Sequence, residues 1–155
     1  NILLQTFENY ALPEASRLML YASDEAKIYL RQISLKSAGF LGAMLLVIFS
    51  FSKFIIVLAG GIQYADYAYV VKGMAILYLF IFMGYPIRMA IRALVLNQHF
   101  FIGYIFSFLF SLISFNFLLS RWSLVGAIIG LICSQIIVLI YWQIILVKNN
   151  FSLWK

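Results

Sequence analysis

Two arginines four residues apart, Arg88 and Arg92, are the clearest candidates for a functional site in this sequence. Residues at i and i+4 share one face of an α-helix, and Tyr85, three residues before Arg88, lies on the same face. Guanidinium groups bind phosphate and carboxylate oxygens through paired hydrogen bonds. Pro86 lies beside them and predicts a kink, because proline lacks a backbone N–H group. We therefore predict a substrate-binding face made by Arg88, Arg92 and Tyr85.

A second interpretation gives the two arginines a topological role only. Arg92 lies about 7 Å along a helix from Asn97, and its long side chain can reach the membrane surface from there. Arg88 is about 13 Å from the same point. A charge at that depth costs several kcal/mol and normally faces protein or water. A hydrated anion site and an interfacial anchor both fit these positions.

The acidic residues of the first segment are weaker candidates. Glu8 and Glu14 are six residues apart, so they do not share a helical face. A role in coupling transport to an ion gradient is one interpretation for either residue. An ordinary ion pair, for example with Arg17, or exposure to water is the interpretation that we favour.

The sequence offers little for catalysis or metal binding. Its single histidine, His99, and its single cysteine, Cys133, do not stand at metal-ligand spacing, so we expect no metal and no cofactor. His99 and Asp66 are expected to be surface residues. There is no Ser/His/Asp set, no nucleophile elbow and no phosphate-binding loop. We therefore predict that the protein is not an enzyme.

The composition determines where such residues must be held. Of 155 residues, 65% are hydrophobic and only 10% are charged, whereas soluble domains carry about 25% charged residues. The chain is therefore a polytopic membrane protein. The net charge of +6 comes from basic residues scattered between apolar runs, which indicates membrane orientation rather than nucleic-acid binding. The chain begins with Asn1 and not Met, and we expect it to be part of a longer protein.

Four runs are long and apolar enough to cross a bilayer as helices, which needs about 20 residues each. They span residues 38–60, 71–96, 100–119 and 124–147. None shows the period-two alternation of barrel strands. A moderately apolar segment, 2–21, is either a surface helix or the end of a spanning helix. We predict an all-α membrane bundle with four full transmembrane helices and one partial N-terminal helix.

The connections set the topology. Residues 23–37 predict a short helix on the membrane surface, and residues 60–69 predict a loop rich in Gly and Tyr. Residues 97–99 and 120–123 predict tight turns, so the helices over 71–96 and 100–119 should be antiparallel neighbours. We name as side A the side of residues 23–37, residues 97–99 and the C-terminus, and as side B the other.

The basic residues are distributed unevenly between the two sides. Five lie in the connections of side A and two in those of side B: Lys27, Arg31, Lys36, Lys148 and Lys155 against Lys72 and Arg121. Basic residues accumulate on the cytoplasmic side of membrane proteins. We therefore expect side A, with the C-terminus, to be cytoplasmic.

Gly126 and Gly130 form a GxxxG pattern in the last apolar run. Small residues at this spacing let helix backbones approach closely in lipid. We expect helix packing within this chain rather than dimerisation.

Several short motifs, in this order, give the chain a resemblance to a known family. They are Leu12-Pro13-Glu14-Ala15-Ser16-Arg17-Leu18, the polar stretch 23–36, Gly61-Ile62-Gln63-Tyr64-Ala65-Asp66-Tyr67-Ala68, Leu96-Asn97-Gln98 and Ser123-Leu124-Val125-Gly126-Ala127. Together they resemble the C-terminal half of bacterial polysaccharide and O-antigen flippases, in the superfamily that includes the multidrug and toxic compound exporters. Ser123 stands where that family usually has glycine.

The resemblance implies that residues 1–155 are a fragment of the C-terminal lobe of a two-lobe transporter in the bacterial inner membrane, and that segment 2–21 is the end of a spanning helix. It implies an undecaprenyl-pyrophosphate-linked oligosaccharide as substrate, with membrane lipids and the N-terminal lobe as partners and no nucleic acid. The assignment of Arg88 and Arg92 to the pyrophosphate is a physical inference from its negative charge. Alternatives are a cation-coupled multidrug exporter, a membrane-embedded polysaccharide polymerase and an assembly subunit.

Overall fold

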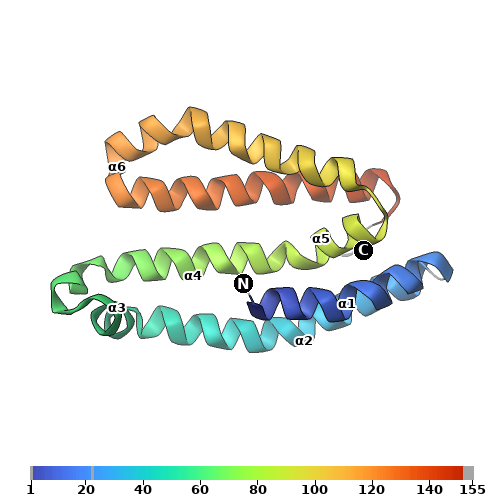
Figure 1. The fold of residues 1–155 in the computed structure, drawn as a ribbon, viewed down its shortest axis with the longest axis horizontal. Helices are drawn as coiled ribbons and strands as arrows, with labels where there is room; N and C mark the ends of the chain where they lie inside the picture. The colour runs from blue at the N-terminus through green and yellow to red at the C-terminus, as the bar shows by residue number, and fades with distance from the viewer. Residues whose placement is uncertain (1, 22, 152–155) are drawn as a thin grey trace.

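A computed structural model describes the backbone of residues 2–21 and 23–151 and the side chains of residues 9–21 and 24–151. All regular elements in this part are helical, which confirms the all-α prediction. They are α1 (Ile2–Tyr21), α2 (Ser23–Ser50), α3 (Ser52–Gly60), the 3₁₀ helix η1 (Ile62–Tyr67), α4 (Ala68–Met83), α5 (Tyr85–Ala93) and α6 (Asn97–Lys148). Figure 1 shows them as an elongated bundle.

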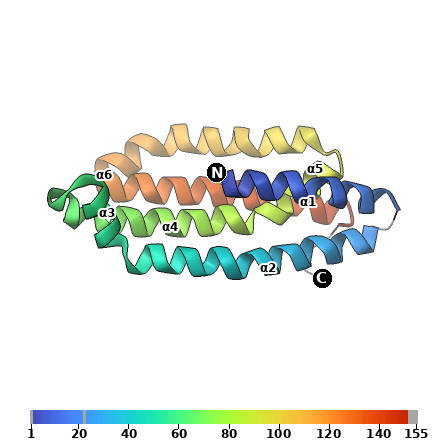
Figure 2. The same ribbon diagram turned by 60° about the horizontal axis from the view of Figure 1, so that its bottom comes forward.

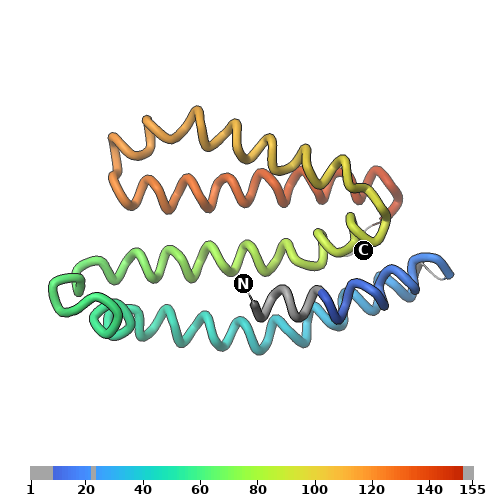
Figure 3. Tube along the Cα trace, viewed as in Figure 1, coloured from blue at the N-terminus to red at the C-terminus, as the bar shows by residue number. Residues whose placement is uncertain are grey.

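Three continuous helical stretches of the described chain are long and apolar enough to cross a membrane: Asp24–Ser50, Ile62–Ala93 and Asn97–Lys148. The last has 52 residues and would be about 78 Å long if straight, more than twice the thickness of the hydrocarbon core. It instead reverses at Ser123, whose backbone is not helical (φ 47°, ψ −128°). The trace in Figure 3 shows this reversal. We call the two antiparallel halves α6a (97–122) and α6b (124–148).

The ends of the bundle follow the predicted topology. The end of α1, the start of α2, the α5–α6 connection and the end of α6 lie together at one end, which is side A (Figure 1). Helix α3, η1 and the reversal at Ser123 lie at the other end, which is side B. The connections that the sequence placed on one side of the membrane are therefore on one side of the bundle.

The separate surface helix predicted over residues 23–37 is wrong. This stretch is the first half of α2, which continues without interruption to Ser50. It contains no glycine or proline to stop it, and Ala26, Leu30 and Ser34 recur at helical spacing and are buried. The break comes later, at Phe51 (φ −97°, ψ 18°), and α3 completes the predicted span to residue 60.

The turn predicted over residues 97–99 lies slightly earlier in the chain. Helix α5 ends at Ala93 and α6 begins at Asn97. The Val95 N–H donates to the Arg92 carbonyl and the Leu96 N–H donates to the Ile91 carbonyl, both at 3.0 Å. These two bonds form a Schellman motif, in which the residue in the left-handed conformation is usually glycine. Here it is Val95 (φ 57°), which is why sequence reasoning placed the turn at the polar residues.

The predicted run 71–96 corresponds to most of α4, to α5 and to the turn after it. The two helices meet at Gly84, two residues before Pro86, so the predicted break is present. The expectation that this run and α6a are direct neighbours is wrong. Figures 1 and 2 both show α6b between α6a and α4. A Cβ atom at Gly73 of α4 would lie 2.6 Å from Ile128, and one at Gly84 would collide with Leu139. Helix α4 thus packs parallel to α6b, because the two contact positions are 11 residues apart in the same direction on each helix.

The buried core lies toward side A and is centred on α5. Its members come from α1, α2, α5, α6b and the segment that follows α6; they are Ala11, Ala15, Leu30, Tyr85, Ile87, Met89, Ala90, Ile91, Val138, Trp142, Leu146 and Phe151. Large apolar side chains elsewhere are mostly exposed, as Phe40, Phe54 and Phe115 are. Such a surface is compatible with lipid and not with water.

Candidate functional site

Helix α5 is a short, strongly amphipathic helix at the centre of the side A core. Tyr85, Pro86, Ile87, Met89, Ala90 and Ile91 are all buried. Pro86 occupies the first turn, where a missing N–H group costs no hydrogen bond. Because neighbouring helices hold α5 on most sides, its two arginines project from a fixed support.

Arg88 is half-buried, and its Nε atom is inaccessible to solvent. Its Cζ atom lies 4.5 Å from the centre of the Tyr85 ring, which is itself only 2% exposed. A guanidinium over an aromatic face is stabilised by the ring quadrupole, more strongly where water is displaced. Tyr85 therefore holds the Arg88 side chain in place, and the structure brings these two predicted residues together.

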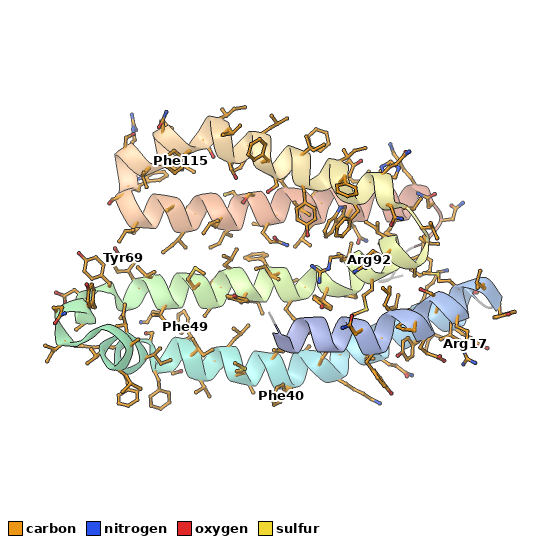
Figure 4. All side chains as sticks on the ribbon, in the orientation of Figure 1. Arg17, Phe40, Phe49, Tyr69, Arg92 and Phe115 are labelled. Carbon is orange, nitrogen blue, oxygen red and sulfur yellow. The ribbon has the colours of Figure 1, made fainter. Side chains whose placement is uncertain are left out.

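Arg92 is one helical turn closer to side A and is exposed. Figure 4 labels it beside the α5–α6 connection, at the same end of the bundle as Arg17. It is in the last turn of α5, where a positive charge interacts favourably with the helix dipole. Arg88, Arg92 and Tyr85 thus share one face, as their spacing predicted. An anion at this face would meet one partly buried and one exposed guanidinium.

Glu14 forms an ion pair with Arg17, with 2.7 Å between the Glu14 Oε1 and Arg17 Nη2 atoms. Both side chains are substantially exposed. The hydrogen bond from Arg17 to Glu14 raises the pKa of the Arg17 guanidinium. This is the ordinary ion pair that we favoured for Glu14. The side chain of Glu8 lies outside the described residues.

The GxxxG residues lie inside the α6 hairpin. A Cβ atom at Gly126 would collide with the Leu118 carbonyl, and one at Gly130 would lie 3.2 Å from the Leu118 side chain. Both glycines therefore border the close approach of α6b to α6a near the turn. Their surroundings belong to helix packing within one chain.

Sequence reasoning missed the environment of His99, which is half-buried and not a surface residue. The hydroxyl of Tyr141 lies 2.9 Å from the His99 Nδ1 atom, and the Trp142 indole N–H donates to the His99 carbonyl at 3.3 Å. The Phe100 and Trp142 rings stack with centres 5.2 Å apart. The predicted turn at residues 120–123 could have indicated a helical neighbour here, since a hairpin brings the start of α6a beside the second half of α6b.

No metal site emerges from the described residues, because none of them form a group of three histidine, cysteine or acidic side chains. Asp66 is exposed within η1, as expected for a surface residue.

Comparison with known proteins finds no match for this chain among protein families, curated proteins or solved structures.

Proposed function

We propose that this chain is part of a transporter that flips an undecaprenyl-pyrophosphate-linked oligosaccharide across the bacterial inner membrane. Side A is cytoplasmic in this proposal. The observation that carries it is the pair of arginines on α5, of which Arg88 is half-buried and lies over Tyr85. The resemblance of the sequence motifs to polysaccharide flippases supports the choice of substrate.

The chemistry of a pyrophosphate suits this pair. It presents several negatively charged oxygens, and two guanidinium groups one helical turn apart offer paired donors to them. A partly desolvated arginine binds an anion more strongly than an exposed one, because the effective dielectric constant is lower. Arg92 would meet the anion first at side A, and Arg88 would bind it one turn deeper.

The distribution of charge supports the orientation. Arg17, Lys27 and Arg31 lie on α1 and the first half of α2, and Lys148 ends α6, all toward side A. Side B has fewer basic residues in its elements: Lys53, Lys72 and Arg121. Cytoplasmic segments of membrane proteins carry this excess. The sugar headgroup would then load from the cytoplasm, and alternating access would release it on the other side.

The test is binding and flipping of a polyprenyl-pyrophosphate-linked oligosaccharide by the protein that contains this chain, in proteoliposomes. Arg88→Gln should lower affinity about 10- to 100-fold, the factor for one hydrogen bond to a charged group of about 1.5–3 kcal/mol. Arg88→Lys should recover only part of the affinity, because lysine cannot bind two oxygens side by side.

Arg121 is a matched control. Its Cζ atom lies 5.2 Å from the Phe117 ring, so it is also an arginine over an aromatic side chain, but it is exposed and at side B. Arg121→Gln should leave affinity and flipping unchanged. Wild-type affinity and flipping in Arg88→Gln, with both variants equally well folded, would remove Arg88 from the site and leave the proposal without its main support.

A further inference from the structure

An open apolar cleft of ≈ 540 Å³ lies between α2, α4, α5 and α6b on the side A half of the bundle. Its walls are Leu35 and Ala38 of α2, Phe82 and Met83 of α4, Ile87 of α5, and Leu139 and Ile140 of α6b, with Ser34 and Gln143 also exposed to it. No described side chain of α1 lines it. Its volume falls within the range of about 300–1,000 Å³ of small-molecule sites.

Two polar features mark the side A end of this cleft. Gln143 lines the cleft, and its Oε1 atom is buried without a hydrogen-bond partner among the described residues. Arg31 precedes Leu35 by one turn on the same face of α2, so it lies just beyond the cleft toward side A. Arg31 is exposed and has no ion-pair or hydrogen-bond partner in the described part of the chain.

The cleft, the amide and the guanidinium thus follow one another from the membrane interior outward. Pure hydrocarbon would leave the Gln143 amide unsatisfied, which is unfavourable for a buried polar group. A phospholipid has the matching order of an acyl chain, ester carbonyls with nearby interfacial water, and a phosphate. The side-chain N–H groups of Gln143 can donate to an ester carbonyl, and the guanidinium matches the phosphate.

We propose that this cleft binds one anionic phospholipid from the side A leaflet. One acyl chain lies between α2, α5 and α6b, the ester region lies at Gln143, and the phosphate lies at Arg31. Basic pockets between transmembrane helices are known lipid-headgroup sites. This inference rests on the membrane-embedded bundle and not on the proposed transport, since Arg88 and Arg92 do not line the cleft.

Native mass spectrometry of the protein in micelles, titrated with phosphatidylglycerol or phosphatidylcholine, tests the proposal. Phosphatidylglycerol should bind at least tenfold more tightly, and Arg31→Gln should remove that preference. Lys36→Gln is the matched control, because Lys36 is exposed on the same helix but about 140° away from Arg31. It should keep the preference. An equal loss in the two variants, or no preference in the wild type, would overturn the headgroup site.

A second pair of variants tests the acyl-chain site. Ala38→Phe fills the cleft and should lower the affinity for both lipids at least tenfold, whereas Ala43→Phe, at an exposed position of α2 outside the cleft, should not. Gln143→Leu should also weaken both lipids. Glycerol 3-phosphate, which has the headgroup charge without the chains, should not bind measurably. Binding of this soluble compound as tightly as the lipid, or unchanged lipid affinity in Ala38→Phe, would refute the cleft as the site.

Discussion

Replacing Ser123 with glycine should stabilise the protein. Ser123 joins the two halves of α6 with φ 47° and ψ −128°, a backbone conformation that L side chains rarely adopt and glycine adopts freely. The flippase family that the sequence motifs resemble usually has glycine at this position. The serine is exposed, so its removal uncovers little buried surface, and relief of backbone strain should dominate the effect.

The expected size follows from two opposing effects. A residue held in such a conformation costs of order 1–3 kcal/mol. Glycine gives back roughly 0.5–1 kcal/mol, because it has more conformational freedom in the unfolded chain. Taken at the middle of each range, the net stabilisation is about 1 kcal/mol. For a chain of this size each kcal/mol corresponds to about 2–4 °C in the melting temperature.

Thermal unfolding in detergent micelles measures this change. Tryptophan fluorescence is a suitable signal, because Trp142 is 2% exposed and belongs to the core that includes α6b. Ser120→Gly is the control with the opposite sign. Ser120 is exposed in the same hairpin but inside helix α6a, where glycine is less favourable than serine by roughly 0.5 kcal/mol.

A lower or unchanged melting temperature for Ser123→Gly would contradict backbone strain at this residue. A shift in the same direction for both serine variants would also contradict it, since that would show an effect of the residue type and not of the local backbone conformation.

Two further substitutions test the same kind of argument. Val95→Gly should raise the melting temperature by a few degrees, because Val95 is β-branched and has φ 57° in a Schellman motif. Asn150→Gly, in the equivalent position at the end of α6, should raise the melting temperature less. A larger rise for Asn150→Gly than for Val95→Gly would contradict this explanation. Gly126→Ala should lower the melting temperature, because the added Cβ atom would collide with the Leu118 carbonyl. Gly39→Ala should raise the melting temperature slightly, because its Cβ atom would meet no atom within 4 Å. Equal shifts in the two variants would show that the close approach of α6a and α6b does not require glycine at position 126.

Much of the fold could be predicted from hydrophobic run length and turn spacing. The runs 100–119 and 124–147 lie within the two halves of α6, and the turn predicted at 120–123 ends at the residue with non-helical backbone angles. These features are local, so a single sequence contains them. The sides of the connections follow by alternation once each crossing is recognised. The common face of Arg88, Arg92 and Tyr85 is likewise a matter of helical spacing.

The errors arose where tertiary contacts decide the outcome. Charges in residues 23–37 suggested a surface helix, but buried Ala26 and Leu30 make this stretch part of a continuous α2. Val95 gave no sign of a helix end, because a valine in the left-handed conformation is an exception to residue preference. The parallel packing of α4 on α6b depends on the contacts of Gly73 with Ile128 and of Gly84 with Leu139. A single glycine in an apolar run does not predict which residue it will contact.

The position of α5 in the core matters most for the candidate site. Small side chains on α1 allow α5 to take this position. Ala11 and Ala15 of α1 have no exposed surface and belong to the same core cluster as Leu30, Met89 and Ala90. Alanines one turn apart allow a helix to pack closely on its neighbours, here α2 and α5. A larger residue at Ala15 would push α1 away from α5 and loosen the support of Arg88 without touching the arginine. The chemistry of the pair therefore depends on residues that carry no chemical signal of their own.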